Sequence, residues 1–526
     1  MENDHRDQIT PESTGSDISG TEPVTRRRFI EGVAVATAGI TIIPSHVLGG
    51  EGRIAPSDKI NFAYIGCGTQ GLREIPALIE LPEVQVIAVC DPQKDAVGYC
   101  DWSPGGLRNS LRTLVKNPGW DTGTGSTIPG GRANAKELVE AYYANVRSDK
   151  KYKGCKAYAD FREMFEKEKG IDAVKIMTPD HLHGLIAMAA MKRGKHVTVH
   201  KPLSNRLLEA EKVIGMAGKT NVITHLIPWD TNGSMEQIME WISNGVIGTL
   251  REIHNWTNRP VWPQYPTLPV NTPPVPKGLD WDLWLGPETA RPYHPWYTHM
   301  VFRGWYDFGG GAMADMGHYS LWTVFKALEL ENPTIIETNL SHVCGMNENK
   351  TAFRVPNTFS FPFSSTVRFK YPAKGFRPPV DLIWYDGGMK PPVPGEFYSG
   401  EKEFPAEGMM FVGDKGKIMS EFVVKNPYVV SGDMKLAAEL TRKPADENKK
   451  AAGIKAFLSG CIKGEQVAGN FREAWSITEA VNLYAVALRA GKTLKYNPKE
   501  RKITNIPEAN NYFTREYRKG WEPESV

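Results

Sequence analysis

The chain has 526 residues, which is too long for one ordinary hydrophobic core and predicts two domains with additional segments. Hydrophobic residues make up 41% of the sequence, so a folded globular protein is expected and a largely disordered chain is excluded. The 63 basic and 60 acidic side chains are spread along the sequence with a formal net charge of +3, which argues against a nucleic-acid-binding protein.

The first 50 residues have the layout of a targeting segment. Residues 1–24 are polar and aperiodic, which predicts a disordered leader. Residues 25–50 begin with Arg26 and Arg27 and continue into an apolar run over 32–43, the pattern of a twin-arginine signal. That run is shorter than the roughly 20 apolar residues of a membrane span. We therefore expect export to the periplasm or beyond; an ordinary basic segment before a buried helix is the alternative.

A strand, a glycine turn and a helix are predicted next, over residues 59–65 and 71–80. The turn has the GxGxxG spacing of a dinucleotide site, in which the helix amides face the phosphates. Its first glycine permits a tight turn, its second a close approach of the pyrophosphate, and its third close packing of helix on strand. The turn residues expected to bind the nucleotide are Gly66, Gly68, Thr69, Gln70 and Gly71.

A second apolar strand over 84–90 ends at Asp91. A carboxylate there accepts hydrogen bonds from the adenosine ribose and repels a 2'-phosphate, which favours NAD over NADP. Lys94 lies close enough to weaken that preference. Residues 92–155 form an insertion with glycine-rich loops around a helix over 135–146; a surface elaboration is the favoured interpretation, and a lid or interface piece is the alternative.

Two further strand and helix units follow. The strand over 171–180 ends in Thr178 and Pro179, and Asp180 is predicted to cap the helix that Gly194 ends. The next strand runs into Lys201. Because ligands gather at the carboxyl ends of parallel strands, we expect one crevice to collect Gly66, Asp91, Thr178 and Lys201.

The segments "YIGCGTQG", "TPDHLHG", "HKPL" and "GGGAMADMGHY" resemble, in order and spacing, those of the Gfo/Idh/MocA family of glucose-fructose oxidoreductase, inositol dehydrogenase and MocA-like proteins. The resemblance runs from 59 to 507. It implies an α/β protein with a Rossmann NAD-binding domain over 58–228, a substrate-binding α/β domain with a large open, mostly antiparallel sheet over 229–507, and a C-terminal tail over 508–526. It also implies hydride transfer between a nicotinamide and a sugar, glycoside or cyclitol carbinol, in a homo-oligomer formed through that sheet.

The resemblance assigns residues to the nicotinamide end of the crevice. Lys201 matches the family lysine that contacts the nicotinamide ribose and the reacting hydroxyl, and His183 matches a histidine on the nicotinamide side. A lysine in a closed crevice beside a positive ring has a lowered pKa and can shuttle a proton. Pro202 restricts the lysine to an extended backbone. His200 replaces the family glutamate and so removes a negative charge beside the ribose.

Asp315 matches the family aspartate that binds substrate. The family acid/base histidine stands four residues later, where this chain has Tyr319, and a histidine stands one residue earlier, at His318. Both positions share a helix face with Asp315. His318 is favoured as the acid/base because its ordinary pKa suits proton transfer near neutrality, with Tyr319 as the rival and a purely structural His318 as the third possibility.

The second half opens with a helix over 234–248 and a strand over 250–260, and Arg303 is expected to contact substrate. Alternating segments over 357–371 and 381–388 predict antiparallel strands. A loop dense in tryptophan either stacks on pyranose rings or packs on itself; its members are Trp262, Trp281, Trp284, Trp296 and Trp305.

The remaining polar side chains narrow the chemistry. Six cysteines without a CxxC pair are expected to be free core thiols. The spacing of Asp180, His181 and His183 is too tight for the usual metal-ligand sets, so no metal is expected, and His225 either lines the pocket or lies in the core. Two other functions stay open: redox-neutral glycoside cleavage with tightly bound NAD, and a nucleotide-loaded sugar-binding module without turnover.

Overall fold

The structure is a computed structural model that describes residues 59–121, 123, 125–147, 152, 154–227, 233–260, 262–375, 377–400, 403–442 and 453–526. All of them belong to one compact unit, Asp58–Val526. The predicted leader and twin-arginine segment, residues 1–50, lie outside the described residues. None of the described helices is long and apolar enough to cross a membrane.

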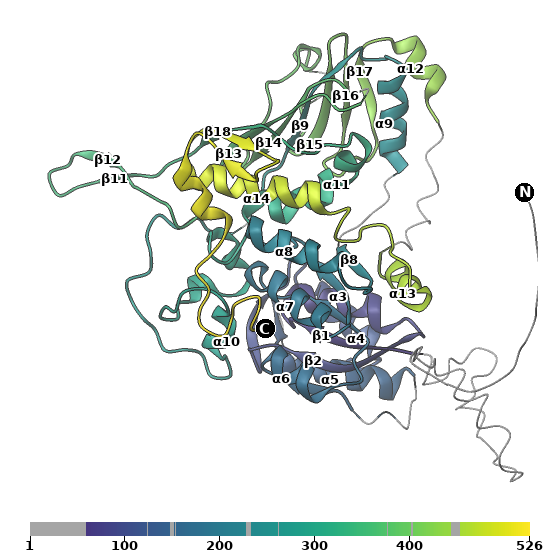
Figure 1. The fold of residues 1–526 in the computed structure, drawn as a ribbon, viewed down its shortest axis with the longest axis vertical. Helices are drawn as coiled ribbons and strands as arrows, with labels where there is room; N and C mark the ends of the chain where they lie inside the picture. The colour runs from purple at the N-terminus through teal and green to yellow at the C-terminus, as the bar shows by residue number, and fades with distance from the viewer. Residues whose placement is uncertain are drawn as a thin grey trace, which may run out of the picture. The chain divides into compact units, whose positions relative to one another are not determined.

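A six-stranded, fully parallel sheet forms the first half (Figure 1). The strand order is β5-β2-β1-β6-β7-β8, with β1 Ile60–Ile65, β2 Val84–Cys90, β5 Lys156–Tyr158, β6 Ala173–Ile176, β7 His196–His200 and β8 Thr224–Ile227. The central strands are almost wholly apolar because helices cover both faces of the sheet. The order reverses between β1 and β6, and at such a switch point a crevice opens beyond the strand ends. The predicted Rossmann architecture is confirmed.

The helices of this half are α3 Thr69–Ile79, α4 Gly106–Leu114, α5 Arg132–Asn145, α6 Phe161–Lys167, α7 Asp180–Lys192 and α8 Leu207–Ala217. A further helix, α13 (Gly453–Lys463), comes from much later in the chain and joins the same core, where Phe457 packs edge-on against Phe62 with ring centroids 6.3 Å apart. The first half is therefore completed by residues outside the predicted boundaries 58–228.

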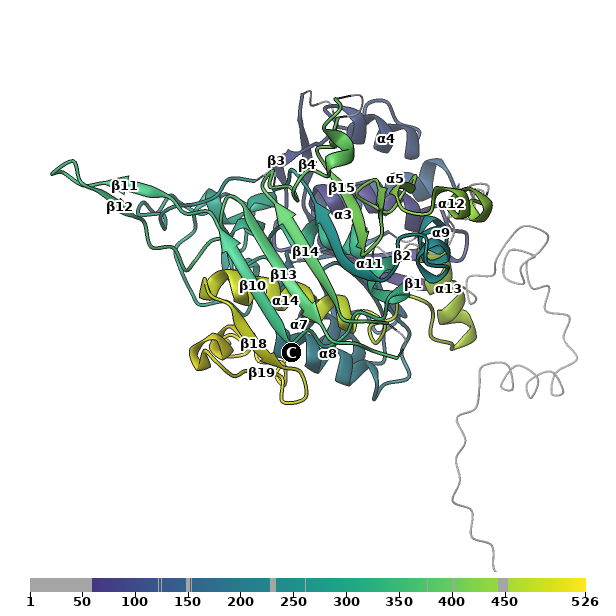
Figure 2. The ribbon, with the colours of Figure 1, turned by 90° about the horizontal axis from the view of Figure 1, so that it is seen from above.

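The second half is built on a nine-stranded sheet in which all neighbours are antiparallel except β9 and β14 (Figure 2). The order is β17-β16-β15-β9-β14-β13-β10-β18-β19. The strands are β9 Leu250–Trp256, β10 Ile335–Leu340, β13 Ser365–Tyr371, β14 Val380–Asp386, β15 Gly408–Gly413, β16 Lys417–Ser420, β17 Tyr428–Ser431, β18 Leu494–Asn497 and β19 Lys502–Ile503. The predicted large, mostly antiparallel sheet is confirmed.

The two faces of this sheet differ, as alternation along each strand requires. Phe369 and Trp384 point into the main core, to which α9 (Gly233–Ser243), α11 (His318–Ala327) and α14 (Trp475–Ala490) contribute. On the other face Trp256 stacks on Phe404 with ring centroids 5.0 Å apart, and Arg368 pairs with Asp381 at 3.0 Å. This outer face is part covered and part charged, and the predicted oligomer through it stays a prediction.

Two peripheral predictions are corrected. Residues 508–526 are not a loose tail, because Arg515 is buried and its Nη1 lies 2.6 Å from Glu288 Oε1, while Trp521 and Val526 are buried in the main core. The six cysteines are free, but not all lie in the core. Cys344 is exposed on the hairpin of β11 (Cys344–Met346) and β12 (Ala352–Arg354), which projects away from the sheet in Figures 1 and 2.

Candidate functional site

A cavity of about 920 Å³ lies beyond the carboxyl ends of β1, β2, β6 and β7, between the two halves. All five residues of the glycine turn line it, together with Asp91, Thr178 and Pro179. At the other end it is lined by His200, Lys201, Arg303, Asp315 and Tyr319. Two predicted site residues, His183 and His318, are not part of the lining. The expected single crevice is present.

The glycine turn is shaped by backbone crowding. Gly66 has φ +95°, and a Cβ there would collide with the backbone of Met177. A Cβ at Gly71 would collide with the carbonyl oxygen of Gly66, so helix α3 packs directly on the turn. The helix begins at Thr69 without a side-chain cap, which leaves its first amides for an anionic ligand.

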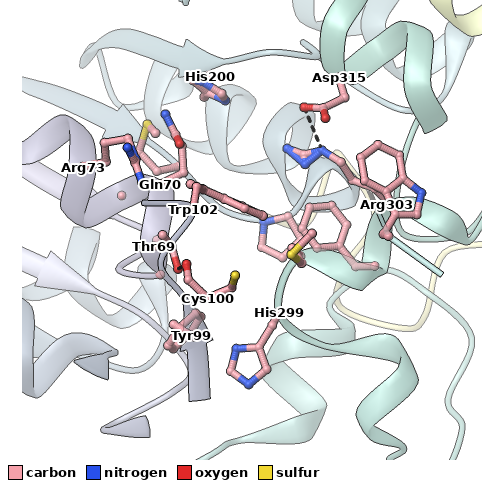
Figure 3. Close-up of a pocket in the computed structure, with 18 of the residues that line it drawn as sticks. Thr69, Gln70, Arg73, Tyr99, Cys100, Trp102, His200, His299, Arg303 and Asp315 are labelled. Atoms are coloured by element: carbon pink, nitrogen blue, oxygen red, sulfur yellow. Dashed lines mark hydrogen bonds and ion pairs between the residues drawn. The ribbon is translucent and has the colours of Figure 1, made fainter. Parts of the chain in front are cut away.

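The insertion lines the cavity, so its interpretation as a surface elaboration is wrong. Its hairpin, β3 (Ala96–Cys100) with β4 (Thr127–Gly130), places the Tyr99 ring 3.0 Å from where a Cβ of Gly68 would be. The Thr69 hydroxyl donates to the Cys100 carbonyl at 2.9 Å. Tyr99 also meets His299 of the second half edge-on, with ring centroids 4.2 Å apart (Figure 3). The open side of Gly68 therefore faces the insertion.

Asp91 braces the glycine turn. Its carboxylate accepts the backbone N–H of Cys67 at 2.6 Å and that of Gln93 at 2.8 Å. Burial raises the pKa of Asp91 to about 6, against the lowering effect of these hydrogen bonds. Each oxygen keeps a lone pair for a ribose hydroxyl, so bracing and ligand binding are compatible.

The end of β6 carries an unsatisfied group. The hydroxyl of Thr178 is buried at the cavity and has no hydrogen-bond partner among the described residues. His183 stands behind it, with Nδ1 2.6 Å from the Pro202 carbonyl oxygen and Nε2 2.8 Å from the Thr178 carbonyl oxygen. The predicted contact of His183 with the nicotinamide side is therefore corrected: this side chain ties the ends of β6 and β7 together from outside the cavity.

Asp180 does not cap α7 as predicted. Pro179 precedes the helix, and the Asp180 carboxylate instead accepts the backbone N–H of Gly310 at 3.1 Å. Its other oxygen lies 3.4 Å from Nη2 of Arg303. Gly194, with φ +67°, follows the helix end as expected.

Lys201 and Asp315 form a buried ion pair at the far end of the cavity. Burial lowers the pKa of Lys201 to about 8; Asp315 raises it and Arg303 lowers it further. The Lys201 Nζ lies 4.9 Å from the centre of the Tyr319 ring. Against burial, which acts in the other direction, Lys201 and Arg303 hold the pKa of Asp315 below its usual value. The Lys201–Pro202 peptide bond is cis.

The segment after Asp315 decides between the two acid/base candidates. Residues Met313–Gly317 form a π-helical turn, whose wider winding keeps the residue four ahead on the face of Asp315 and moves the residue three ahead off it. Tyr319 is 38% exposed, and its hydroxyl lies 3.3 Å from His200 Nε2. His318 is fully buried, with Nδ1 2.9 Å from the Ala314 carbonyl oxygen, and burial lowers its pKa to about 3. The structure therefore places Tyr319, and not His318, in the cavity lining, and the acid/base role stays a prediction.

Arg303 is held by two carboxylates. Its Nε lies 3.3 Å from Asp315 Oδ1, the contact drawn in Figure 3, and its Nη2 faces Asp180. It lines the cavity as predicted, and its two contacts with carboxylates are ion pairs, with no hydrogen-bond partner for Nε among the described residues.

Part of the tryptophan-rich loop lines the cavity and part packs on itself, and stacking on a sugar ring stays a prediction. Trp262 and Trp284 line the cavity, whereas Trp305 is buried in the cluster of this loop. Trp281 stacks on Trp284 with ring centroids 4.9 Å apart. His225 lies in the core, with Nδ1 3.3 Å from the Thr198 hydroxyl.

Three lining residues at the Asp315 end were not predicted: Asn258, Arg259 and Glu407. Asn258 and Arg259 follow the end of β9 at Trp256 by two and three residues, and a polar pair just after a strand end is the signal by which they could have been found. Within the described residues no group of three or more histidine, cysteine, aspartate or glutamate side chains is placed to hold a metal ion.

Comparison with known proteins gives matches in both halves. Residues 129–227 match the family model described as the NAD-binding Rossmann fold of the Gfo/Idh/MocA oxidoreductase family, and residues 236–345 match the model of its C-terminal alpha/beta domain. A levoglucosan dehydrogenase from Pseudarthrobacter phenanthrenivorans is 30% identical over 115 residues, which are 22% of this chain and 29% of that protein.

A glycosyl hydrolase family 109 protein from Streptomyces filamentosus is 28% identical over 161 residues, which are 31% of this chain and 24% of that protein. The chain thus matches less than a third of the length of either curated relative. The solved structure of a WlbA dehydrogenase from Bordetella pertussis, in complex with NADH and UDP-GlcNAcA, is 12% identical and superposes with a TM-score of 0.49, covering 84% of this chain and 99% of its own.

Proposed function

We propose that the chain is an NAD-dependent oxidoreductase of the Gfo/Idh/MocA family that transfers a hydride between a CH–OH carbon of a sugar, glycoside or cyclitol and the nicotinamide. One observation carries the proposal: the ion pair of Lys201 and Asp315, with Tyr319 beside it, shares a single cavity with the glycine turn. The cavity volume of about 920 Å³ lies within the range of small-molecule and cofactor sites.

The residues at the glycine turn fit a dinucleotide. The uncapped start of α3 offers amides to phosphates, and the buried Thr178 hydroxyl lacks a partner that a bound nicotinamide nucleotide would supply. Asp91 favours a free 2'-hydroxyl and hence NAD over NADP. When bound, the nucleotide supplies the hydride acceptor.

The chain's own residues handle the proton and the orientation of the substrate. Lys201 in its neutral form accepts the proton of the carbinol, and the pKa of about 8 keeps a useful neutral fraction near neutrality. Asp315 accepts a hydrogen bond from a neighbouring hydroxyl and fixes the sugar. Tyr319, whose ring lies beside Lys201 and whose hydroxyl lies beside His200, is the second candidate acid/base in place of His318.

The test is direct. The purified full chain is denatured to release and identify its nucleotide, and the native protein is mixed with NAD and a panel of sugars, glycosides and cyclitols while the absorbance of reduced nicotinamide is followed. Reduction by one class of these compounds supports the proposal. Binding of a sugar without any absorbance change across the panel would instead indicate a nucleotide-loaded binding module.

A second function is redox-neutral glycoside cleavage, which the family 109 relative favours. In that case chromogenic glycosides are cleaved without added cofactor and without net nucleotide reduction. Net oxidation of free sugar, with no cleavage, decides against it.

We also propose export by the twin-arginine route, because Arg26 and Arg27 precede a short apolar run. A reporter fused after residue 50 should leave the cytoplasm, and replacing both arginines by lysine should retain it. Association of copies through the outer face of the nine-stranded sheet is proposed as well, and light scattering of Arg368→Glu against the unchanged chain tests it.

A further inference from the structure

Asp180 is a carboxylate buried between the two halves of the protein. It is the first residue of α7 and is not exposed at all, yet it does not cap that helix. Its Oδ2 accepts the Gly310 N–H at 3.1 Å, and its Oδ1 lies 3.4 Å from Arg303 Nη2. Gly310 and Arg303 both belong to the second half. The Asp180 carboxylate therefore holds a segment of the second half against the first half.

The Arg303 guanidinium, which pairs with Asp180, also contacts Asp315 at the reacting end of the cavity. Arg303 Nε lies 3.3 Å from Asp315 Oδ1, and the same oxygen is the one paired with Lys201. The four groups therefore alternate in charge from Asp180 through Arg303 and Asp315 to Lys201. Ion pairs at both Nη2 and Nε restrict this long side chain to one geometry more than either pair alone would.

We propose that Asp180 is a positioning residue for the proposed hydride transfer: by anchoring Arg303, it makes that guanidinium share the Asp315 carboxylate with Lys201. The inference rests on the proposed function of Lys201 and Asp315, but the anchoring itself is independent of any substrate. It assigns Arg303 to the protein's own charge network as well as to the cavity wall.

Anchoring of Arg303 by Asp180 changes the pKa of Lys201 in a direction that can be measured. The charged and titratable groups around the Lys201 amine are Asp315, Arg303, Asp180, His200, His318 and Tyr319. Arg303 lowers the pKa of Lys201, and Asp180 by its own charge raises it to a smaller extent. If Asp180 acts through Arg303, its removal releases the guanidinium and raises the pKa of Lys201. If it acted only by its own charge, its removal would lower that pKa.

The experiment titrates Lys201 by competitive acetylation of the purified full chain with acetic anhydride from pH 6 to 11, with the Lys201 peptide quantified by mass spectrometry. Asp180→Asn and Arg303→Gln should each raise the midpoint by about one pH unit. The double variant should match Arg303→Gln alone. The matched control is Asp307→Asn, a carboxylate of the same segment that pairs with Arg291 at 2.7 Å and should leave the midpoint in place.

An unchanged or lowered midpoint in Asp180→Asn, or additive shifts in the double variant, would overturn the inference. If the Asp180→Asn variant does not accumulate, the Arg303→Lys variant is used instead. Its ammonium keeps the charge but cannot contact both Asp180 and Asp315, so the midpoint of Lys201 should rise in this variant too. A midpoint equal to that of the unchanged chain overturns the inference. Acetylation needs no substrate. If the Lys201 midpoints shift as expected but no sugar reduces the nucleotide, the proposed function is contradicted and the positioning role of Asp180 is not.

Discussion

At the scale of single residues, Lys201 sets the expected pH dependence. Only the neutral amine accepts a proton, and burial lowers its pKa to about 8. Oxidation of a carbinol should therefore be slow below pH 8, rise through that pH and level off above it. Lys201→Met should reduce the rate about 10²- to 10⁴-fold and abolish the rise, while nucleotide still binds. Stopped-flow reduction of NAD across pH measures both; a profile that falls with pH would contradict the assignment.

Substitutions of Tyr319 and His318 are expected to have opposite effects on rate and stability. Tyr319→Phe removes the hydroxyl near His200 and should slow hydride transfer about 10²-fold with little loss of stability. His318→Gln alters a fully buried side chain away from the cavity lining. It should lower the melting temperature and change the rate less than tenfold. Steady-state kinetics beside thermal unfolding separates the two, and the reverse ranking would restore His318.

The sequence predicted Lys201 and Asp315 but not which neighbour faces them. The deciding feature is the π-helical turn Met313–Gly317, which shifts the helix phase by one position. Such a turn has no signature in hydrophobic spacing. Likewise, Asp180 had an adequate local explanation as a helix cap, and only the tertiary contact with Arg303 shows what the carboxylate binds.

At the scale of elements, the hairpin of the insertion connects the two walls of the cavity. Tyr99 meets His299 of the second half, and the backbone N–H of Lys94 donates to the Gly278 carbonyl at 2.7 Å. A nucleotide in the cavity is thereby enclosed from both sides. Because an aromatic pair contributes about 0.5–1.5 kcal/mol, Tyr99→Ala should speed nucleotide release up to about tenfold.

Displacement of bound NADH by excess NAD, followed by fluorescence, measures that release rate. Phe353→Ala on the projecting hairpin removes an exposed aromatic ring far from the cavity lining and serves as the control. Equal release rates in the two variants would mean that the insertion contributes nothing to retention.

The strands of both sheets were predictable because apolar runs and alternation report burial directly. The insertion was not, since its two strands are short, lie more than 25 residues apart and carry exposed residues such as Val97. Long-range pairing of this kind leaves no local pattern.

At the scale of the whole molecule, Arg515 joins the C-terminal segment to the core. It is buried beside Glu288 at 2.6 Å and Glu209 at 3.6 Å. Arg515→Met leaves the buried Glu209 without its cation and Glu288 with Arg206 alone, at 3.5 Å, and should cost about 3–5 kcal/mol of the free energy of unfolding. Removal of the arginine raises the pKa of Glu288 still further above its usual value, so the loss should be larger at pH 8 than at pH 5.

Denaturant unfolding at both pH values measures this loss. Lys212→Met is the matched control, because Lys212 pairs with Glu524 of the same segment at 3.2 Å, their side chains are 50% and 75% exposed, and such pairs contribute at most about 1 kcal/mol. Equal losses in the two variants would show that the buried network is not what holds the segment.

The two-domain division was predictable from the order of strands, whereas the return of α13 and residues 515–526 to the first half was not. The sequence of an amphipathic helix shows which of its faces is buried, but it does not show against which core that face packs. The predicted boundaries at 228 and 507 therefore do not coincide with the packed halves, because segments after residue 452 also pack on the first half.

This late return bears on how the protein is made. Residues 453–463 and 515–526 leave the ribosome after the rest of the first half, so the first sheet cannot complete its hydrophobic covering until they emerge, and the first half cannot fold fully before the second is synthesised. We expect stalled chains ending at residue 440 to be degraded rapidly in pulse proteolysis, with protection appearing only in chains that include residues 515–526. Capture of the nucleotide would then follow the emergence of those residues.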